Sequence, residues 1–218
     1  MAADCPKQFL RLGRYTVLEW AVRRLLGSDR IAGAVIAVTR PAELVIPAQI
    51  SGGKPVRVCQ GGRERWESVL CGLDALMPLA DVRDWVLVHD AARPCIRTED
   101  VSQLCDELAG DDVGGLVAVP VTDTIKQSDD CGRVIRTVSR HHLWRAQTPQ
   151  MFRLGMLHEA LERVRDEGVA VTDEASAMEY CGYTPRLVTG RQDNIKITRP
   201  GDLDWAGWIL RQQGERCE

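Results

Sequence analysis

The 218-residue sequence lacks a strong excess of charge of either sign. Its 28 Lys and Arg residues stand against 31 Asp and Glu residues, which gives a net charge of −3. A global basic field for nucleic acid is therefore excluded, although a local anion site is not. No apolar run approaches the ~20 residues that a membrane span needs, and the residues after Met1 lack the apolar core of a secretion signal. We expect a cytoplasmic protein that binds neither nucleic acid nor a membrane.

The sequence also lacks several common site motifs. Its eight cysteines are spread over the chain and contain no Cys-x-x-Cys pair, so neither a zinc site nor a disulfide scaffold is expected. The four histidines form no metal set, because His141 and His142 adjoin and would face opposite ways in a strand. Gly-x-Ser-x-Gly and Walker lysine motifs are absent. We expect free thiols in a reducing compartment.

Apolar, β-branched runs alternate with amphipathic segments along most of the chain. The predicted strands are residues 35–39, 56–58, 85–89, 115–120, 186–188 and 194–197. The predicted helices are residues 16–26, 64–76, 99–108, 154–165 and 173–180, with a last one from about residue 200. This alternation predicts a single α/β domain over residues 1–218, with a mostly parallel sheet flanked by helices. Ligands bind such sheets at the carboxyl ends of the strands, which directs attention to the loops after Gln60, His89 and Pro120.

Residues 122–140 break this alternation. They are polar and predict a strand, a turn at residues 129–132 and a second strand. A hairpin with few core residues is marginally stable alone. We therefore expect it to dock on something else, and a partner subunit is a reasonable candidate.

The string His-Asp-Ala-Ala-Arg-Pro at residues 89–94 ends a predicted buried strand. Its small residues let a ligand approach the backbone, and Asp90 could hold a magnesium ion or a hydroxyl group. Arg93 could bind a phosphate with its planar guanidinium. The alternative is a plain turn closed by an Asp–Arg ion pair, but the position at a strand end favours a functional role.

Three further features are weaker alone. Gly61 and Gly62 lie between a predicted strand and a helix, where backbone N–H groups suit an anion or the polar edge of a base, but a simple tight turn is equally compatible. Lys196 lies in a predicted apolar strand, so its ammonium needs an anionic partner or must point to solvent. Residues 173–176 are typical of a capped helix start.

Five strings in this order resemble one family over essentially the whole chain, the 2-C-methyl-D-erythritol 4-phosphate cytidylyltransferases. They are Cys-Pro-Lys-Gln at residues 5–8, the stretch 61–68, the string at 89–94, Asp-Glu-Ala-Ser at 173–176 and Asp-Asn-Ile-Lys-Ile-Thr-Arg-Pro at 193–200. The resemblance implies a homodimeric, Rossmann-like α/β nucleotidyltransferase. It implies that an oxygen of methylerythritol phosphate attacks the α-phosphorus of CTP, that pyrophosphate leaves, and that Mg²⁺ bridges the triphosphate. It also implies that residues 122–140 form a dimerisation arm that reaches into the neighbouring active site.

The resemblance implies a set of site residues as well. The catalytic candidates are Lys7, which would stabilise the transition state, and Arg140 and Lys196, which would position methylerythritol phosphate. Further substrate contacts match Asp90, Arg93, Thr124 and Thr148. Positions that line the cytosine and ribose site match Gly62, Arg63, Ser68 and Ala91. The candidate magnesium ligands are Asp90 and Asp193.

The sequence departs from the family pattern at its start. The family opens with an apolar strand and a Gly-rich loop of the type Pro-Ala-Ala-Gly-x-Gly-x-Arg-Met, and Met1 falls where that loop ends. We therefore expect a strand to be missing from the middle of the sheet, with its ladder hydrogen bonds and apolar area. Two alternatives to the implied function stay open. One is a non-catalytic dimeric relative without the triphosphate loop, and the other is a cytidylyltransferase for a pentitol phosphate.

Overall fold

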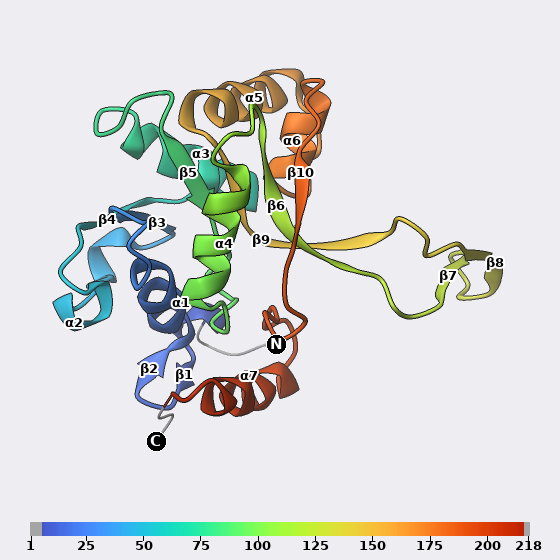
Figure 1. Ribbon diagram of the computed structural model, residues 1–218, viewed down its shortest axis with the longest axis horizontal. Coiled ribbons are helices and arrows are strands. Elements are labelled where there is room, and N and C mark those ends of the chain that lie inside the picture. Colours follow the sequence, from blue (N-terminus) through green and yellow to red (C-terminus); the bar gives the residue numbers. More distant parts are fainter. Residues whose placement is uncertain (1–5, 216–218) are drawn as a thin grey trace.

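The computed structural model describes residues 6–215, which form an α/β body with one long projecting hairpin (Figure 1). The main sheet contains β5 (Trp85–Val88), β6 (Gly114–Pro120), β9 (Trp144–Arg153) and β10 (Arg186–Thr189), in the order β10-β6-β9-β5. β6 and β10 are parallel, whereas β9 is antiparallel to both β5 and β6. Three of the four strands thus share one direction. The predicted α/β class is confirmed, and the antiparallel β9 is an addition to it.

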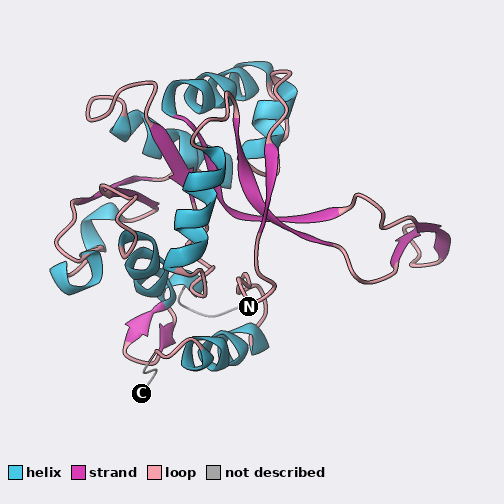
Figure 2. Ribbon diagram, viewed as in Figure 1, coloured by secondary structure: helices cyan, strands magenta, loops and turns pink. Residues whose placement is uncertain are grey.

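A second parallel pair, β3 (Ala34–Val38) and β4 (Val56–Gln60), lies beside the main sheet without pairing to it (Figure 2). Among the described strands, β3 pairs only with β4 and β5 pairs only with β9. β5 reads Trp-Val-Leu-Val, yet all four residues are only half-buried. The main sheet and the β3–β4 pair therefore form two separate groups of strands, with β3 and β5 each unpaired along one edge among the described residues.

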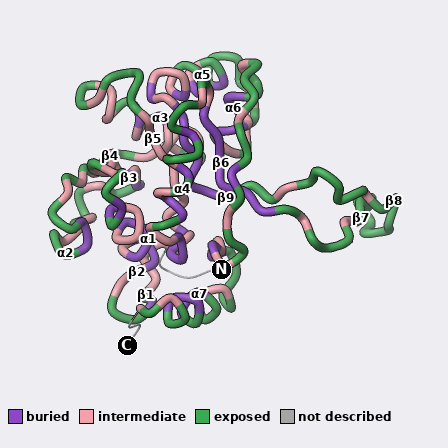
Figure 3. Tube along the Cα trace, viewed as in Figure 1, coloured by how far each residue is buried: buried purple, intermediate pink, exposed green. Residues whose placement is uncertain are grey.

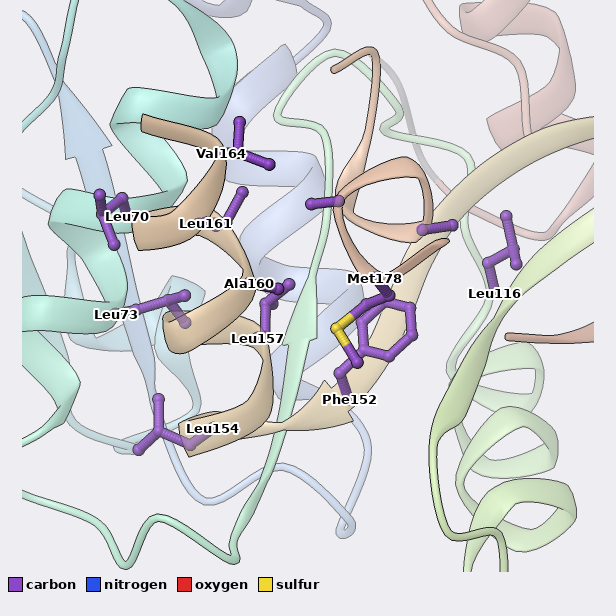
Figure 4. Packing of buried hydrophobic residues seen from close by; sticks show 12 residues of the cluster. Leu70, Leu73, Leu116, Phe152, Leu154, Leu157, Ala160, Leu161, Val164 and Met178 are labelled. Atoms are coloured by element: carbon purple, nitrogen blue, oxygen red, sulfur yellow. The ribbon is translucent and has the colours of Figure 1, made fainter. Parts of the chain in front are cut away.

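Helices cover both faces of the main sheet. On one face, α3 (Arg65–Leu76), α5 (Leu154–Glu167) and α6 (Glu174–Tyr180) enclose the apolar cluster of Figure 4, which includes Leu157 and Phe152. On the other face, Leu104 and Leu108 of α4 (Thr98–Leu108) pack on Met151. Met151 and Phe152 are neighbours on β9, and because side chains alternate along a strand, they serve opposite faces.

The ends of these helices follow from local sequence. Thr16 caps α1 (Val17–Leu26) in a capping box with Glu19, and Asp173 caps α6 by accepting a hydrogen bond from the Ser176 backbone N–H. Gly168 ends α5 at a φ of 66°, a left-handed conformation that glycine adopts without strain. The remaining described elements are η1 (Lys7–Phe9), β1 (Arg11–Leu12), β2 (Tyr15–Thr16), η2 (Pro41–Glu43), α2 (Ala48–Ser51) and α7 (Gly201–Gln212).

The projecting hairpin consists of β7 (Ile125–Ser128) and β8 (Val134–Val138), which pair antiparallel. We call residues 122–140 the arm. Figure 3 shows it as almost entirely exposed, and the apolar Val134 and Ile135 are each 61% exposed. The predicted hairpin is confirmed. Since it leaves the body as a continuation of β6 and enters it again as β9, the arm is anchored in the two most buried strands.

Three expectations about the chain need correction or comment. Residues 194–197 form no strand, since they lie in a loop with one backbone hydrogen bond from the Ile197 N–H to the Ala92 carbonyl oxygen. His141 and His142 do not face opposite ways, because a turn brings their rings into edge-to-face contact at 3.7 Å. None of the described cysteines forms a disulfide, while Cys5 and Cys217 lie outside the described residues.

No helix of residues 6–215 is long and apolar enough to cross a membrane.

Candidate active site

The candidate site forms where β5 ends. Asp90 lies two residues after the last residue of β5, and its backbone N–H donates a 3.0 Å hydrogen bond to the Thr148 hydroxyl of β9. β9 can supply this contact because it is antiparallel to β5, so that its first half lies at the carboxyl end of the neighbouring strand. Arg93, in the turn after β5, donates a 2.7 Å hydrogen bond to the Asn194 carbonyl oxygen. The loop that carries Lys196 is thereby held against the end of the sheet.

A half-buried histidine organises this turn. His89 accepts or donates at both ring nitrogens: Nε2 lies 3.0 Å from the Arg93 carbonyl oxygen, and Nδ1 lies 3.0 Å from the Thr148 hydroxyl. A carbonyl oxygen can only accept, so Nε2 carries the proton and Nδ1 accepts from Thr148. Burial lowers the pKa of His89 to about 4, which keeps the ring neutral. The hydroxyl of Thr148 is thus oriented between the ring and the Asp90 backbone.

The Asp90 carboxylate lies among cations from three separate segments. Lys196 Nζ is 2.9 Å from Oδ2, Arg65 Nε is 2.9 Å from Oδ1, and Arg93 Nε is 3.5 Å from Oδ2. Burial alone would raise the pKa of Asp90, but the charges of Arg65 and Lys196 outweigh it and hold the pKa far below its usual range. The structure supplies the anionic partner that the Lys196 ammonium required.

Lys7 belongs to the same cluster. Burial and the neighbouring ammonium of Lys196 lower the pKa of Lys7, against the opposing charge of Asp90. The structure therefore brings together Lys7, Asp90, Arg93, Thr148 and Lys196, five of the predicted site residues. Cations outnumber carboxylates here, so the pocket is suited to negatively charged, phosphorylated ligands.

The glycine turn forms the second part of the site. A cavity of about 480 Å³ is lined by Thr39, Gln60, Gly61, Gly62, Arg63 and Glu67. The Gly62 N–H donates to the Ser68 hydroxyl at 3.1 Å, and the Arg63 N–H donates to the Glu67 carboxylate at 2.6 Å. One amide is thus satisfied by a hydroxyl and the other by a carboxylate, and because the Glu67 carboxylate would repel an anion, the turn is better suited to a base than to a phosphate. Ala91 packs against the apolar cluster beneath β3 and joins this half to Asp90.

Two predicted residues lie elsewhere in the chain. Thr124 and Arg140 are exposed at the base of the arm, where Arg140 donates a hydrogen bond to the Thr122 carbonyl oxygen. Within residues 6–215, no hydrogen bond or ion pair joins either of them to the Asp90 cluster. A single chain therefore does not bring them to the pocket, which is the arrangement expected if the arm serves a neighbouring subunit.

The two candidate magnesium ligands do not fit a protein-held ion. Both oxygens of Asp90 are engaged by cations, which would repel Mg²⁺. Asp193 Oδ2 accepts a 2.7 Å hydrogen bond from Arg97, and its Oδ1 is buried without a hydrogen-bond partner. A single free carboxylate oxygen is a poor substitute for the several oxygen ligands of Mg²⁺. No group of three or more His, Cys, Asp and Glu side chains suited to a metal occurs within residues 6–215.

Sequence reasoning missed Arg65 and Glu174. Arg65 donates to both oxygens of Glu174, at 2.6 and 2.9 Å, in addition to its bond with Asp90. Glu174 is fully buried. In the sequence, Glu174 was visible only as part of the string at residues 173–176, which is typical of a capped helix start and gives it no partner. The partners are 109 residues apart, so no local pattern could pair them.

A partly parallel α/β sheet with a cationic cluster and a glycine-lined cavity at its strand ends is typical of enzymes that bind phosphorylated nucleotides. The comparisons make this specific. The family model of 2-C-methyl-D-erythritol 4-phosphate cytidylyltransferase matches residues 1–212. The chain belongs to this family.

Individual relatives agree. The cytidylyltransferase of Ectopseudomonas mendocina is 49% identical over 216 residues, which cover 98% of this chain and 92% of the relative. That of Serratia proteamaculans is 47% identical over 97% of this chain and 89% of its own length. The crystal structure of the Francisella tularensis cytidylyltransferase is similar with a TM-score of 0.83 at 33% identity, covering 95% of this chain and 94% of that one. The α/β fold is thus that of a known cytidylyltransferase.

Proposed function

We propose that this chain transfers the cytidylyl group of CTP to 2-C-methyl-D-erythritol 4-phosphate in the non-mevalonate route to isoprenoid precursors. A phosphate oxygen of the acceptor forms a bond to the α-phosphorus, and the bond from the α-phosphorus to the bridging oxygen breaks. Pyrophosphate leaves with that electron pair, and 4-diphosphocytidyl-2-C-methyl-D-erythritol remains. The observation that carries the proposal is the cationic cluster around Asp90, built from residues that match the family's motifs.

The acceptor occupies the half of the pocket formed by Arg93 and Lys196. Two phosphorylated substrates repel each other, so bringing them together requires fixed positive charge. Lys7, Arg93 and Lys196 supply three cations against the single carboxylate of Asp90. Asp90 then binds a hydroxyl group of methylerythritol phosphate, and Thr148 keeps the turn that carries Asp90 in place.

The nucleotide occupies the half that contains the glycine turn. Gly62, Arg63, Ser68 and Ala91 contact cytosine and ribose, and Glu67 keeps the turn closed through its hydrogen bonds. Lys7 stabilises the negative charge that develops at the α-phosphorus. Because the aspartates do not fit a metal, we assign Mg²⁺ to the substrate complex Mg-CTP rather than to a site on the protein, and its chemistry there would be the neutralisation of phosphate charge.

We further propose that the active form is a homodimer in which the arm of one subunit brings Thr124 and Arg140 to the pocket of the other. Two observations support this proposal. The arm exposes apolar side chains, and the hydrogen bond of Arg140 goes to the Thr122 carbonyl oxygen within the arm. A cytoplasmic location is part of the proposal, and the described cysteines, none of which forms a disulfide, support it.

The direct test is pyrophosphate release by the purified chain with CTP, Mg²⁺ and methylerythritol phosphate. Turnover that requires both substrates is expected. No turnover together with no binding of Mg-CTP would instead favour a non-catalytic dimeric relative, and calorimetry with Mg-CTP measures that binding, since retained tight binding would defeat this alternative. Faster turnover with a pentitol phosphate than with methylerythritol phosphate would show that the pentitol phosphate is the preferred acceptor.

A further inference from the structure

The bridge formed by Arg65 is the most tightly connected polar feature that the proposed chemistry leaves unused. Its guanidinium contacts two carboxylates at once, with three N–H donors at 2.6 to 2.9 Å. Arg65 is the first residue of α3, directly after the glycine turn, while Glu174 is the first residue of α6. Asp90 lies at the end of β5. One side chain therefore ties together three elements that meet around the pocket.

Burial makes the contact between Arg65 and Glu174 a fixed one. Glu174 is fully buried, and burial raises its pKa against the opposing hydrogen bonds of Arg65. A buried carboxylate without a partner is strongly destabilised. Glu174 therefore fixes the two terminal nitrogens of the Arg65 guanidinium. Because the guanidinium is planar, this also fixes the direction of its Nε, which donates to Asp90.

This arrangement determines how the Asp90 carboxylate is oriented. Arg65 takes Oδ1, so Oδ2 is left facing Lys196 and Arg93, the two cations assigned to the acceptor phosphate. Without Arg65, the carboxylate could rotate about its terminal bond and bind Lys196 or Arg93 through either oxygen. Misplacement of a binding group by about 1 Å can cost on the order of 100-fold in rate.

The pair also controls charge. Glu174 neutralises Arg65, so that Arg65 can hold Asp90 without adding net positive charge behind it. The excess positive charge of Lys7, Arg93 and Lys196 then lies on the substrate side of Asp90. The charge of Arg65 is thus used to hold Asp90 in place, whereas the charges of Lys7, Arg93 and Lys196 remain for binding phosphate.

We propose that Arg65, anchored by Glu174, is a positioning residue that fixes the orientation of Asp90 and thereby of the acceptor-binding cations. This rests on the proposed function, because the acceptor is methylerythritol phosphate. Arg65 touches no reacting atom. Its effect passes through Asp90, and that path is what an experiment can isolate.

The experiment is a double-mutant cycle on the full chain with Arg65→Lys and Asp90→Asn. Lysine keeps the charge but cannot span both carboxylates, so we expect kcat/KM for methylerythritol phosphate to fall 10- to 100-fold, with KM for CTP changed less than threefold. In the Asp90→Asn background, the same Arg65→Lys change should reduce kcat/KM by less than threefold, since the group that it positions is already altered. Losses that multiply would overturn the proposal, as would an unchanged kcat/KM in the single variant.

Two controls complete the cycle. Arg163→Lys, in an exposed ion pair with Glu167 on α5, makes the same chemical change away from the pocket and should leave kinetics as they are. If Arg65→Lys fails to fold, Glu174→Gln weakens the anchor while preserving side-chain shape, and it should raise KM for the acceptor at least threefold with KM for CTP unchanged. An unchanged acceptor KM in folded Glu174→Gln would overturn the proposal. Turnover by the unmodified chain tests the proposed function separately.

Discussion

The pocket around Asp90 and the arm are opposite in construction. The pocket holds its polar groups through bonds from several distant segments, and His89, Asp90 and Arg93 each have at least one partner far along the chain or across the turn. The arm has bonds almost entirely within itself and exposes apolar side chains. The comparison indicates that the polar contacts of the Asp90 cluster form within one folded chain, whereas the arm makes few contacts outside itself within residues 6–215.

Removing the Lys196 ammonium is the most severe test of the pocket. Lys196→Ala should lower kcat/KM about 10²- to 10³-fold, the usual cost of losing one fixed donor to developing charge. Stability should change little, because Asp90 keeps Arg65 and Arg93 as partners. Turnover and thermal unfolding of the same preparation measure both effects. Parallel losses of melting temperature and activity would make Lys196 a structural residue instead.

Mixed dimers test whether the arm completes the pocket of a neighbour. Arg140→Ala and Lys196→Ala homodimers should each be nearly inactive. Mixing them after unfolding and refolding should restore part of the activity, because one pocket of a mixed dimer then has both residues intact. Activity of the mixture compared with that of each parent is the measurement. If the mixture contains mixed dimers and is still inactive, the arm does not complete the pocket of the neighbouring subunit.

Acid should weaken the pocket through His89. The unfolded chain binds a proton at this ring below about pH 6.5, whereas the folded chain excludes it until about pH 4. The free energy of unfolding should therefore fall by roughly 3 kcal/mol as the pH drops through this window. Urea unfolding from pH 7 to pH 4 gives the slope, and His89→Gln, which cannot titrate, should flatten it. An equal slope in both proteins would contradict this assignment.

The smallest effect on folding is expected in the arm. Val134→Ser combined with Ile135→Ser should leave the thermal stability of the body within about 0.5 kcal/mol, as for exposed positions in general. Both side chains are 61% exposed in the single chain. Replacing them should therefore weaken the association of subunits and leave the folding of each subunit unchanged. Sedimentation should shift toward the monomer at low concentration. An unchanged dimer with these two polar residues would place the interface elsewhere.

Local patterns predicted most of the fold, and β9 shows where they stop. Its second half is buried, but Pro149 interrupts the run and its first half is exposed beside the arm, so neither composition nor alternation indicated a strand. For residues 194–197 the prediction was wrong in the opposite sense, because a strand was predicted where the structure has a loop. Their alternating isoleucines resemble a strand, yet Ile195 and Ile197 pack on the cluster beneath α7 from a loop.

The candidate site was predictable only where it lies in continuous strings. Asp90, Arg93 and Lys196 stand in motifs whose order along the chain is informative. The contacts among them are not, because the Asp90 partners Arg65 and Lys196 come from different elements, and Glu174 is more than a hundred residues from Arg65. Side chains that meet only after folding leave no signal in local spacing.

The continuity of β9 with the arm has a mechanical consequence. The same strand that emerges from the arm at Trp144 carries Thr148, whose hydroxyl fixes the turn of Asp90. Between these two positions the chain stays within β9, although its pairing with β6 shifts register between Ala146 and Gln150. The base of the arm and the turn that holds Asp90 therefore share one strand, so that in the proposed dimer a displacement of the arm would act on the same segment that carries Thr148.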